Sequence, residues 1–243
     1  MGSSHSLNGV NPKYLSYKAL NLAYPLRRLE NDIKIVTKWI NLVPNIKLII
    51  MPADYITLWH NKLNKKYNTL TELHFSLEPS FYDYFNHMRL CEFNCHKYGN
   101  SDGFMARSKK FSEFKNLEKE KQISERIEDF HNSLLATTNF NKVVNKSIDE
   151  IEDFMIFCEN RNIEVLFIEF PVTSQLKKNY RDSLTKYSLV DYAEKRNWNT
   201  MKFYDEEFND SLFNDPNHLN IKGAKKATIM IDSVIINLLE KTN

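Results

Sequence analysis

The chain has 243 residues, 42% of them hydrophobic and 13% aromatic, which is enough to bury the core of one domain with an insertion. Its 33 basic and 31 acidic residues give a formal net charge of +2, so the charge balance gives no reason to expect a nucleic-acid partner or a polybasic membrane anchor. Three cysteines do not make a disulfide framework, and neither a signal peptide nor a membrane-spanning apolar run is recognisable. The simplest interpretation is a cytoplasmic protein, whose oligomeric state the sequence leaves open.

The first part of the chain predicts one helix and one strand. Residues 1–25 are punctuated by Gly, Ser, Asn and Pro, which favour turns and irregular structure. Residues 26–42 carry apolar side chains at spacings of three and four with charges between them, which predicts an amphipathic helix that ends before Pro44. The short apolar run at 46–51 then predicts a buried strand.

Residues 54–142 break this pattern and predict a largely helical insertion that covers one side of the fold. The segment is rich in aromatic residues, Asn and Lys, and its charge runs, as in a predicted helix at 112–135, are typical of solvated helix faces. Cys91 and Cys95 precede His96 here, but no fourth ligand stands nearby at a typical spacing. Two ordinary thiols are therefore a simpler interpretation than a metal site.

The remainder of the chain alternates regularly between helices and strands. The predicted elements are helices at 147–160, 180–196 and 221–239 and strands at 164–170 and 201–204. Short links between alternating helices and strands indicate crossover units and a parallel sheet. We therefore predict the α/β class, with residues 1–243 forming a single domain.

Two clusters, far apart in the sequence, carry side chains suited to acyl transfer. The first is Gly2-Ser3-Ser4-His5, and the second, between the last predicted strand and helix, contains Asp215 and His218. A serine hydroxyl becomes a strong nucleophile when an imidazole takes its proton, and a carboxylate on the other ring nitrogen enforces the correct tautomer. Such groups gather beyond the carboxyl ends of parallel strands. The glycine permits a sharp turn, at which a serine N–H can face a developing oxyanion.

Each cluster alone also has a purely structural interpretation. Asn214-Asp215-Pro216-Asn217 is a good turn sequence, beside which His218 could simply pack, and Gly/Ser-rich termini are commonly disordered. Met1-Gly2-Ser3-Ser4-His5 is also how a common polyhistidine expression tag begins, but the histidine run is absent and we interpret it as native. The two clusters together, in this order around an α/β pattern, favour the catalytic interpretation.

The motifs resemble those of one enzyme family. Gly2-Ser3-Ser4-His5 resembles the Gly-Asp-Ser block of SGNH/GDSL hydrolases, in the Gly-Ser-Ser variant of some bacterial members. Asp215-Pro216-Asn217-His218 is similar to their Asp-x-x-His block, and the Leu219-Asn220-x-x-Gly223-Ala224 that follows is also typical. The resemblance implies the family fold, a flavodoxin-like, three-layer arrangement with a five-stranded parallel sheet flanked by helices.

The resemblance also implies an activity. Ser4 would be the nucleophile, His218 the general base and Asp215 its orienting partner, in an acyl ester hydrolase or O-acyltransferase that needs no metal or organic cofactor. Relatives with the Gly-Ser-Ser variant suggest O-acetyl groups of a bacterial glycan as the substrate. The partner expected for the chain is thus a small-molecule or glycan ester.

The sequence departs from the family pattern at two places. Family members have a strand before the nucleophile, whereas a single residue precedes Gly2, and Ala53 stands where their third block has an oxyanion asparagine. Gly2, His5 and Asn21 are the remaining candidates for oxyanion or substrate binding, Asn21 because it stands where the family's second block begins. An alternative is therefore a degenerate SGNH-like domain that binds a glycan or a protein partner.

Overall fold

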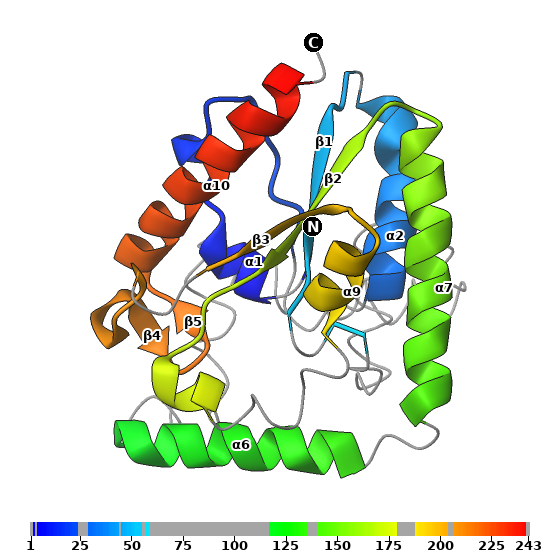
Figure 1. Cartoon of the computed structure of the whole chain (residues 1–243). Coiled ribbons are helices and arrows are strands. Elements are labelled where there is room, and N and C mark those ends of the chain that lie inside the picture. Colours follow the sequence, from blue (N-terminus) through cyan, green and yellow to red (C-terminus); the bar gives the residue numbers. More distant parts are fainter. Residues whose placement is uncertain are drawn as a thin grey trace, which may run out of the picture.

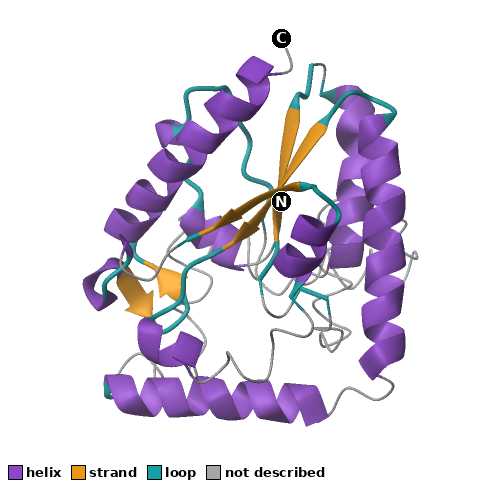
Figure 2. Ribbon diagram, viewed as in Figure 1, coloured by secondary structure: helices purple, strands orange, loops and turns teal. Residues whose placement is uncertain are grey.

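The computed structural model has a mixed α/β fold, in which a three-stranded parallel sheet packs against helices and a separate pair of strands is antiparallel (Figure 1, Figure 2). Helices flank the parallel strands on both sides in these views. The residues that the structure describes are 2, 4–23, 29–43, 45–54, 57–58, 117–135, 140–178, 188–203 and 207–241.

The parallel sheet has the order β1-β2-β3, with β1 (Leu48–Pro52), β2 (Glu164–Glu169) and β3 (Asn199–Lys202). The central strand pairs on both sides, and Leu166 in its middle lies opposite Ile50 of β1. β2 is buried on both faces, which explains why its sequence is an uninterrupted apolar run and does not alternate with polar residues.

Three helices cover one face of the sheet. They are α2 (Leu29–Trp39), α7 (Phe140–Glu159) and α9 (Leu189–Lys195), with α2 and α7 side by side (Figure 1). Val165 and Phe167 of β2 point to this side and join a buried cluster with apolar residues of all three helices. The apolar stripe of each helix is thereby removed from water, which stabilises the fold by roughly 25 cal/mol per Å2 of apolar surface.

The long helix α10 (Ile221–Lys241) covers the opposite face (Figure 1). Leu166 and Ile168, the alternate residues of β2, pack with Ala227 and Ile231 of this helix. Because successive side chains of a strand point to opposite faces, the one strand β2 contributes to both cores.

The N-terminal segment is attached to α10 by hydrogen bonds. It begins with α1 (Ser4–Gly9). The buried hydroxyl oxygen of Thr228 accepts the backbone N–H of Asn11 at 2.9 Å. Further on, the carboxylate of Asp232 accepts the backbone N–H and the hydroxyl of Ser16, at 2.7 and 2.6 Å. The helix that covers the sheet therefore also holds the segment that contains the predicted nucleophile.

The antiparallel pair consists of β4 (Phe213–Asp215) and β5 (His218–Leu219). The sequence predicts a loop here, but the structure pairs Asp215 with His218 across a two-residue turn. Pro and Asn favour open loops and tight hairpin turns alike, which is why the sequence does not distinguish the two. The pairing brings the two residues of the Asp-x-x-His motif face to face.

Several predicted elements are present with shifted ends. The helix predicted at 26–42 is α2, continued by the 3-10 helix η2 (Ile40–Leu42). The helix predicted at 147–160 begins earlier, at the start of α7, because apolar residues such as the buried Val144 continue its inward stripe. The strand predicted at 201–204 is β3, two residues earlier. The remaining short helices among the described residues are η1 (Pro12–Tyr14), η6 (Asp210–Leu212) and a helical stretch at 174–178.

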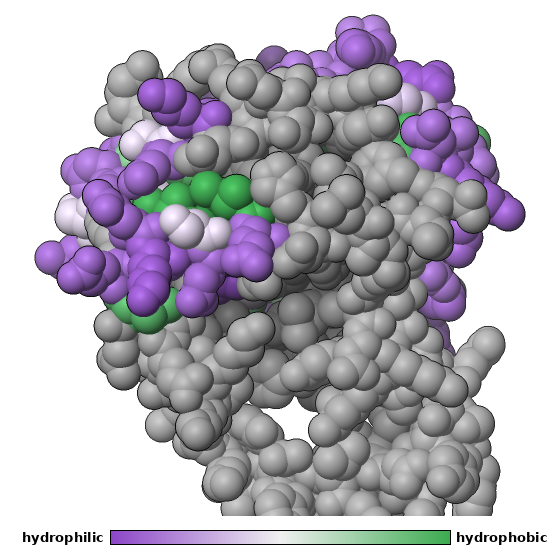
Figure 3. Space-filling view, turned by 90° about the horizontal axis from the view of Figure 1, so that it is seen from below, coloured by the Kyte–Doolittle hydropathy of each residue, from purple (hydrophilic) through white to green (hydrophobic). Residues whose placement is uncertain are grey.

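Within the predicted insertion, α6 (Lys119–Leu135) is the main described element. Gln122 and Ile123 are buried, whereas Lys121 and Glu125 are exposed, as expected of a helix with one solvated, charged face. The view from below shows a described surface that is largely hydrophilic around a small apolar area (Figure 3).

Other predictions fall on residues outside the described part of the chain. These include most of the predicted insertion, with Cys91, Cys95 and His96, and the first half of the helix predicted at 180–196. Among the helices that the structure describes, none is both long and apolar enough to cross a membrane.

Candidate active site

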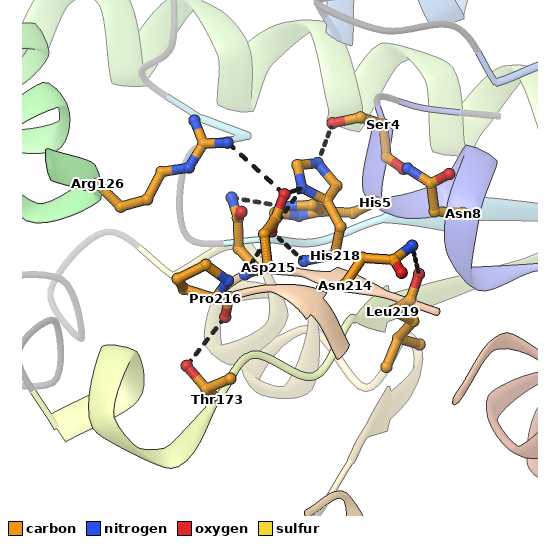
Figure 4. Close-up of polar contacts among 11 residues, drawn as sticks. Ser4, His5, Asn8, Arg126, Thr173, Asn214, Asp215, Pro216, His218 and Leu219 are labelled. Carbon is orange, nitrogen blue, oxygen red and sulfur yellow. Dashed lines mark hydrogen bonds and ion pairs between the residues drawn. The ribbon is translucent and has the colours of Figure 1, made fainter. Parts of the chain in front are cut away.

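The three residues that the resemblance implies as a triad lie together (Figure 4). The hydroxyl oxygen of Ser4 is 2.9 Å from Nε2 of His218. Nδ1 of the same imidazole is 2.9 and 2.8 Å from the two carboxylate oxygens of Asp215. This is the order of contacts that a nucleophile, a general base and an orienting carboxylate require.

The position of Asp215 selects the tautomer of His218. A carboxylate can only accept hydrogen bonds, so the neutral imidazole carries its hydrogen on Nδ1, the atom that Asp215 contacts. Nε2 then has a free lone pair directed at the hydroxyl of Ser4. The imidazole is therefore arranged to accept the serine proton.

The pKa of Asp215 keeps it ionised over the neutral range. Burial alone would raise the pKa of this carboxyl, but the charge and hydrogen bond of His218 outweigh burial. Arg126 of α6 and the backbone N–H of Asn217 add to the lowering, and the resulting pKa is about 2. The guanidinium of Arg126 lies 3.8 Å from Oδ2 of Asp215.

The pKa of His218 lies below the ordinary value for histidine. Burial is the largest cause, because it disfavours the charged imidazole, and Asp215 opposes it. The positive charges of His5 and Arg126 lower this pKa further. His218 is therefore neutral at pH 7, the form in which it can act as a base.

The turn between β4 and β5 is held by local and distant hydrogen bonds. Oδ1 of Asp215 accepts the backbone N–H groups of Asn217 and His218, at 3.0 and 2.9 Å, which forms an Asx-type turn. From the segment after β2, Thr173 donates its backbone N–H and its hydroxyl to the carbonyl oxygen of Pro216. No local sequence pattern indicates a role for Thr173, because this contact joins residues 43 positions apart.

Ser4 is positioned by a glycine that no other residue can replace without strain. Gly2 has a φ of +114°, and a Cβ built there would lie 2.4 Å from Oγ of Ser6 and 2.6 Å from Cγ of Pro52. Its backbone N–H donates to the buried carboxylate of Asp32 at 3.0 Å. The close approach of Gly2 to the end of β1 fixes where α1, and with it Ser4, begins.

His5 lies beside the nucleophile in sequence, but its ring is buried. The side chain is 4% exposed, and Nδ1 lies 2.9 Å from Oδ2 of Asp54, directly after β1. Nε2 lies 3.2 Å from Nδ2 of Asn217. A substrate bound at Ser4 would therefore touch little of this ring.

The positions of Asn21 and Ala53 bear on the oxyanion site. The side-chain nitrogen of Asn21 donates to the carbonyl oxygens of Ser6 and Val10, at 3.2 and 2.7 Å, so both of its hydrogens are in use. The backbone N–H of Ala53 donates to Ile168 at 2.7 Å, and its side chain has no donor. In this arrangement neither residue has a hydrogen left for a substrate oxygen, and the oxyanion role of Asn21 stays a prediction.

Three residues near the triad were not predicted from the sequence. They are Asp54, Arg126 and Thr173. Of these, only Asp54 could have been predicted from the sequence, because it is a carboxylate directly after a predicted strand, where the site residues of parallel sheets gather. Arg126 looks like one more charge in a solvated helical run.

The described residues contain no group of three or more His, Cys, Asp or Glu side chains that could hold a metal ion. No protein family, no curated protein and no solved structure matches the chain. The resemblance to SGNH/GDSL hydrolases therefore depends on the two sequence motifs and on the geometry that joins them.

Proposed function

We propose that the protein is a serine-dependent acyl ester hydrolase or O-acyltransferase of the SGNH/GDSL type. The observation that carries the proposal is the contact of Ser4 with Nε2 of His218, whose Nδ1 faces Asp215. The parallel sheet with helices on both faces and the Asp-x-x-His motif just before the last helix support the proposal, although the described part of the chain has three parallel strands where the family has five.

The reaction would proceed through an acyl-enzyme. Oγ of Ser4 attacks the ester carbonyl carbon while its proton passes to Nε2 of His218, and the imidazolium is stabilised by Asp215. Collapse of the tetrahedral intermediate breaks the bond to the alkoxy group, which takes the proton from His218. Water or an acceptor hydroxyl then attacks the acyl-serine and gives up its proton to His218. The bond between Oγ of Ser4 and the acyl carbon breaks, and Oγ takes the proton back from His218.

The substrate proposed is an O-acetyl group on a bacterial glycan or its precursor. This part of the proposal depends only on the Gly-Ser-Ser form of the first motif and is an analogy with relatives that share it. Hydrolysis and transfer differ in which hydroxyl group reaches the acyl-serine, and both use the same three residues.

Labelling with a fluorophosphonate tests the proposal directly, because this reagent reacts preferentially with activated serines. We expect stoichiometric labelling located on Ser4 by peptide mass spectrometry and abolished in Ser4→Ala and His218→Ala. Ser124→Ala, which removes an exposed serine of α6, is the matched control and should label normally. A folded protein that does not label, or labels at another serine, would refute the hydrolase assignment.

A second candidate function is a binding module without catalytic activity. It is favoured by Asn21 and Ala53, neither of which has a hydrogen left to donate to an oxyanion. Losing one oxyanion donor typically lowers the rate about a hundred- to a thousand-fold. A glycan that binds wild type and Ser4→Ala equally, together with no labelling of either, would support this candidate. Glycan binding combined with labelling would support the enzyme.

A further inference from the structure

His5 takes part in a closed path of contacts around the candidate triad. Its neighbour in the chain, Ser4, contacts His218, whose partner Asp215 accepts the backbone N–H of Asn217 at 3.0 Å. The side chain of Asn217 leads back to Nε2 of His5. Both residues therefore contact the turn between β4 and β5: Ser4 contacts the imidazole of His218, and His5 contacts Asn217 with its own imidazole (Figure 4).

The second nitrogen of the His5 ring is bound by a carboxylate. Nδ1 contacts Oδ2 of Asp54, and Oδ1 of Asp54 accepts the backbone N–H of Phe170 at 3.1 Å. Asp54 directly follows β1 and Phe170 directly follows β2, so the carboxylate links His5 to the ends of two neighbouring strands. Asp54 is 2% exposed, so the pair is shielded from solvent.

The side-chain amide of Asn217 is informative about the protonation of His5. With Nδ2 turned to His5, Nε2 of the ring has to accept, and the buried Oδ1 of Asn217 has no hydrogen-bond partner in the described part of the chain. Rotating the amide by 180° exchanges two atoms of nearly equal shape. Oδ1 then faces Nε2 and accepts a hydrogen bond if Nε2 carries a hydrogen, while Nδ2 moves to the position at which Oδ1 had no partner among the described residues. With Nδ1–H donated to Asp54, the ring is an imidazolium.

We propose that His5 is a positioning residue for the acyl-transfer site, an inference that rests on the proposed function. It is an imidazolium held between the carboxylate of Asp54 and the side-chain oxygen of Asn217. In this form it fixes the turn that carries Asp215 and His218, and its charge adds to the burial that keeps His218 neutral in the resting site.

The charges around the two rings agree with this assignment. The ring centroids of His5 and His218 are 5.2 Å apart at an interplanar angle of 66°, too close for two cations to be favourable. Burial lowers the pKa of His5, but Asp54 and, to a lesser degree, Asp215 outweigh it and raise the pKa above the ordinary value, against the opposing charge of Arg126. The pKa of His218 is lowered instead. Of the two rings, His5 is therefore the one that binds a proton more readily, and His218 is left to accept one from the serine.

The charge of His5 affects the pH range over which His218 can accept the serine proton. A His218 with a lowered pKa stays neutral as the pH falls below the ordinary value of about 6.5, so serine activation extends into mildly acidic solution. Removing the charge of His5 raises the pKa of His218, and activation is then lost at a higher pH.

Nuclear magnetic resonance of the imidazole nitrogens measures both properties without requiring any reaction. Spectra of the 15N-labelled protein are recorded between pH 5 and 9 and assigned with His5→Gln and His218→Gln. At pH 7 we expect both nitrogens of His5 in the protonated form, and His218 as the neutral tautomer with its hydrogen on Nδ1. A single protonated nitrogen on His5 at pH 7 would overturn the proposal.

Two variants then test the coupling. In His5→Gln we expect the titration midpoint of His218 to move up by about one pH unit or more. In Asp54→Asn, the side-chain oxygen still accepts the backbone N–H of Phe170, but the neutral amide no longer stabilises an imidazolium, so His5 becomes neutral. The titration midpoint of His218 then also moves up, by less than in His5→Gln. Lys195→Gln, which removes an exposed charge of α9, is the control and should leave it unchanged. A purely structural His5 would alter the unfolding midpoint of its variants but not the titration of His218.

The pH at which fluorophosphonate labelling falls to half on the acid side should follow the same order. It should be lowest in wild type and highest in His5→Gln. If His5→Gln does not fold, Asp54→Asn alone decides the question. A folded variant in which His218 titrates as in wild type would refute the role of His5. Failure of the proposed function would instead show as absent labelling in a protein whose imidazoles titrate as expected, so the two failures are distinguishable.

Discussion

Thr173 donates two hydrogen bonds to the same carbonyl oxygen of Pro216, from its backbone nitrogen at 2.9 Å and from its hydroxyl at 3.1 Å. Pro216 lies between the two residues of the Asp-x-x-His motif and Thr173 lies just after β2, so this contact attaches the motif to the sheet. Thr173 is itself buried, with 3% of its surface exposed.

Thr173→Val keeps the shape and the backbone hydrogen bond but removes the hydroxyl. We expect a loss of about 1 kcal/mol in the free energy of unfolding, the usual net contribution of one hydrogen bond, measured by urea denaturation. We also expect slower labelling of Ser4, because the imidazole is held less firmly. Thr173→Ser retains the hydroxyl and should behave like wild type; equal behaviour of both variants would show that the hydroxyl has no positioning role.

Gly2→Ala tests whether the backbone before the nucleophile requires glycine. The substitution forces a side chain into a positive φ and against Oγ of Ser6 and the ring of Pro52. We expect a destabilisation of about 1–3 kcal/mol and a lower rate of serine labelling. The control is Ser124→Ala, and a Gly2→Ala protein that matches it in both measurements would contradict the close packing described at this position.

Asp215→Asn should block activation of the serine without disturbing the fold. An amide nitrogen facing Nδ1 of His218 donates to it, and the ring then carries its hydrogen on Nε2, where the serine hydroxyl needs an acceptor. In hydrolases with a Ser-His-Asp triad this change lowers the rate by about 10^4, and we expect a comparable loss of labelling. Asp210→Asn, at an exposed carboxylate of η6, is the matched control.

Glu169, at the end of β2, should make stability fall as the pH rises. Burial, the largest cause, raises its pKa to about 7, Lys177 and Lys202 oppose the rise, and Asp54 and Asp191 add to it. The folded protein then binds more protons than the unfolded chain between the unfolded pKa of 4.5 and 7. Protonated Glu169 therefore contributes fully to the free energy of unfolding below pH 4.5. As the pH rises through 7 this contribution is lost, and the free energy of unfolding falls by about 2–3 kcal/mol.

Glu169→Gln removes this dependence. Urea denaturation at pH 5 and pH 8 should give a smaller difference in the free energy of unfolding than in wild type, with most of the gain at pH 8. Glu159→Gln, at an exposed position of α7, should leave the difference unchanged. An equal pH dependence in wild type and Glu169→Gln would mean that this carboxyl is hydrated in solution.

Periodic patterns predicted the helices and strands because burial of one face acts over neighbouring residues. The stripe of α10 and the apolar run of β2 are of this kind, and both are present within two residues of their predicted ends. The pairing of β4 with β5 was not predicted, because its turn residues suit a loop equally well. The pairs His5–Asp54 and Thr173–Pro216 join distant positions, and no local pattern of side chains indicates such contacts.

The contact between Ser4 and His218 spans 214 positions of the sequence. Bringing two groups together over so long a loop has a large entropic cost, which has to be offset by the packing of the whole sheet and its helices. Because this cost is met before the contact can stabilise the chain, we expect the contact to form only once the intervening elements are in place. An activated serine therefore cannot exist in a partly folded chain, and its reactivity during refolding would report the moment at which the native topology is complete.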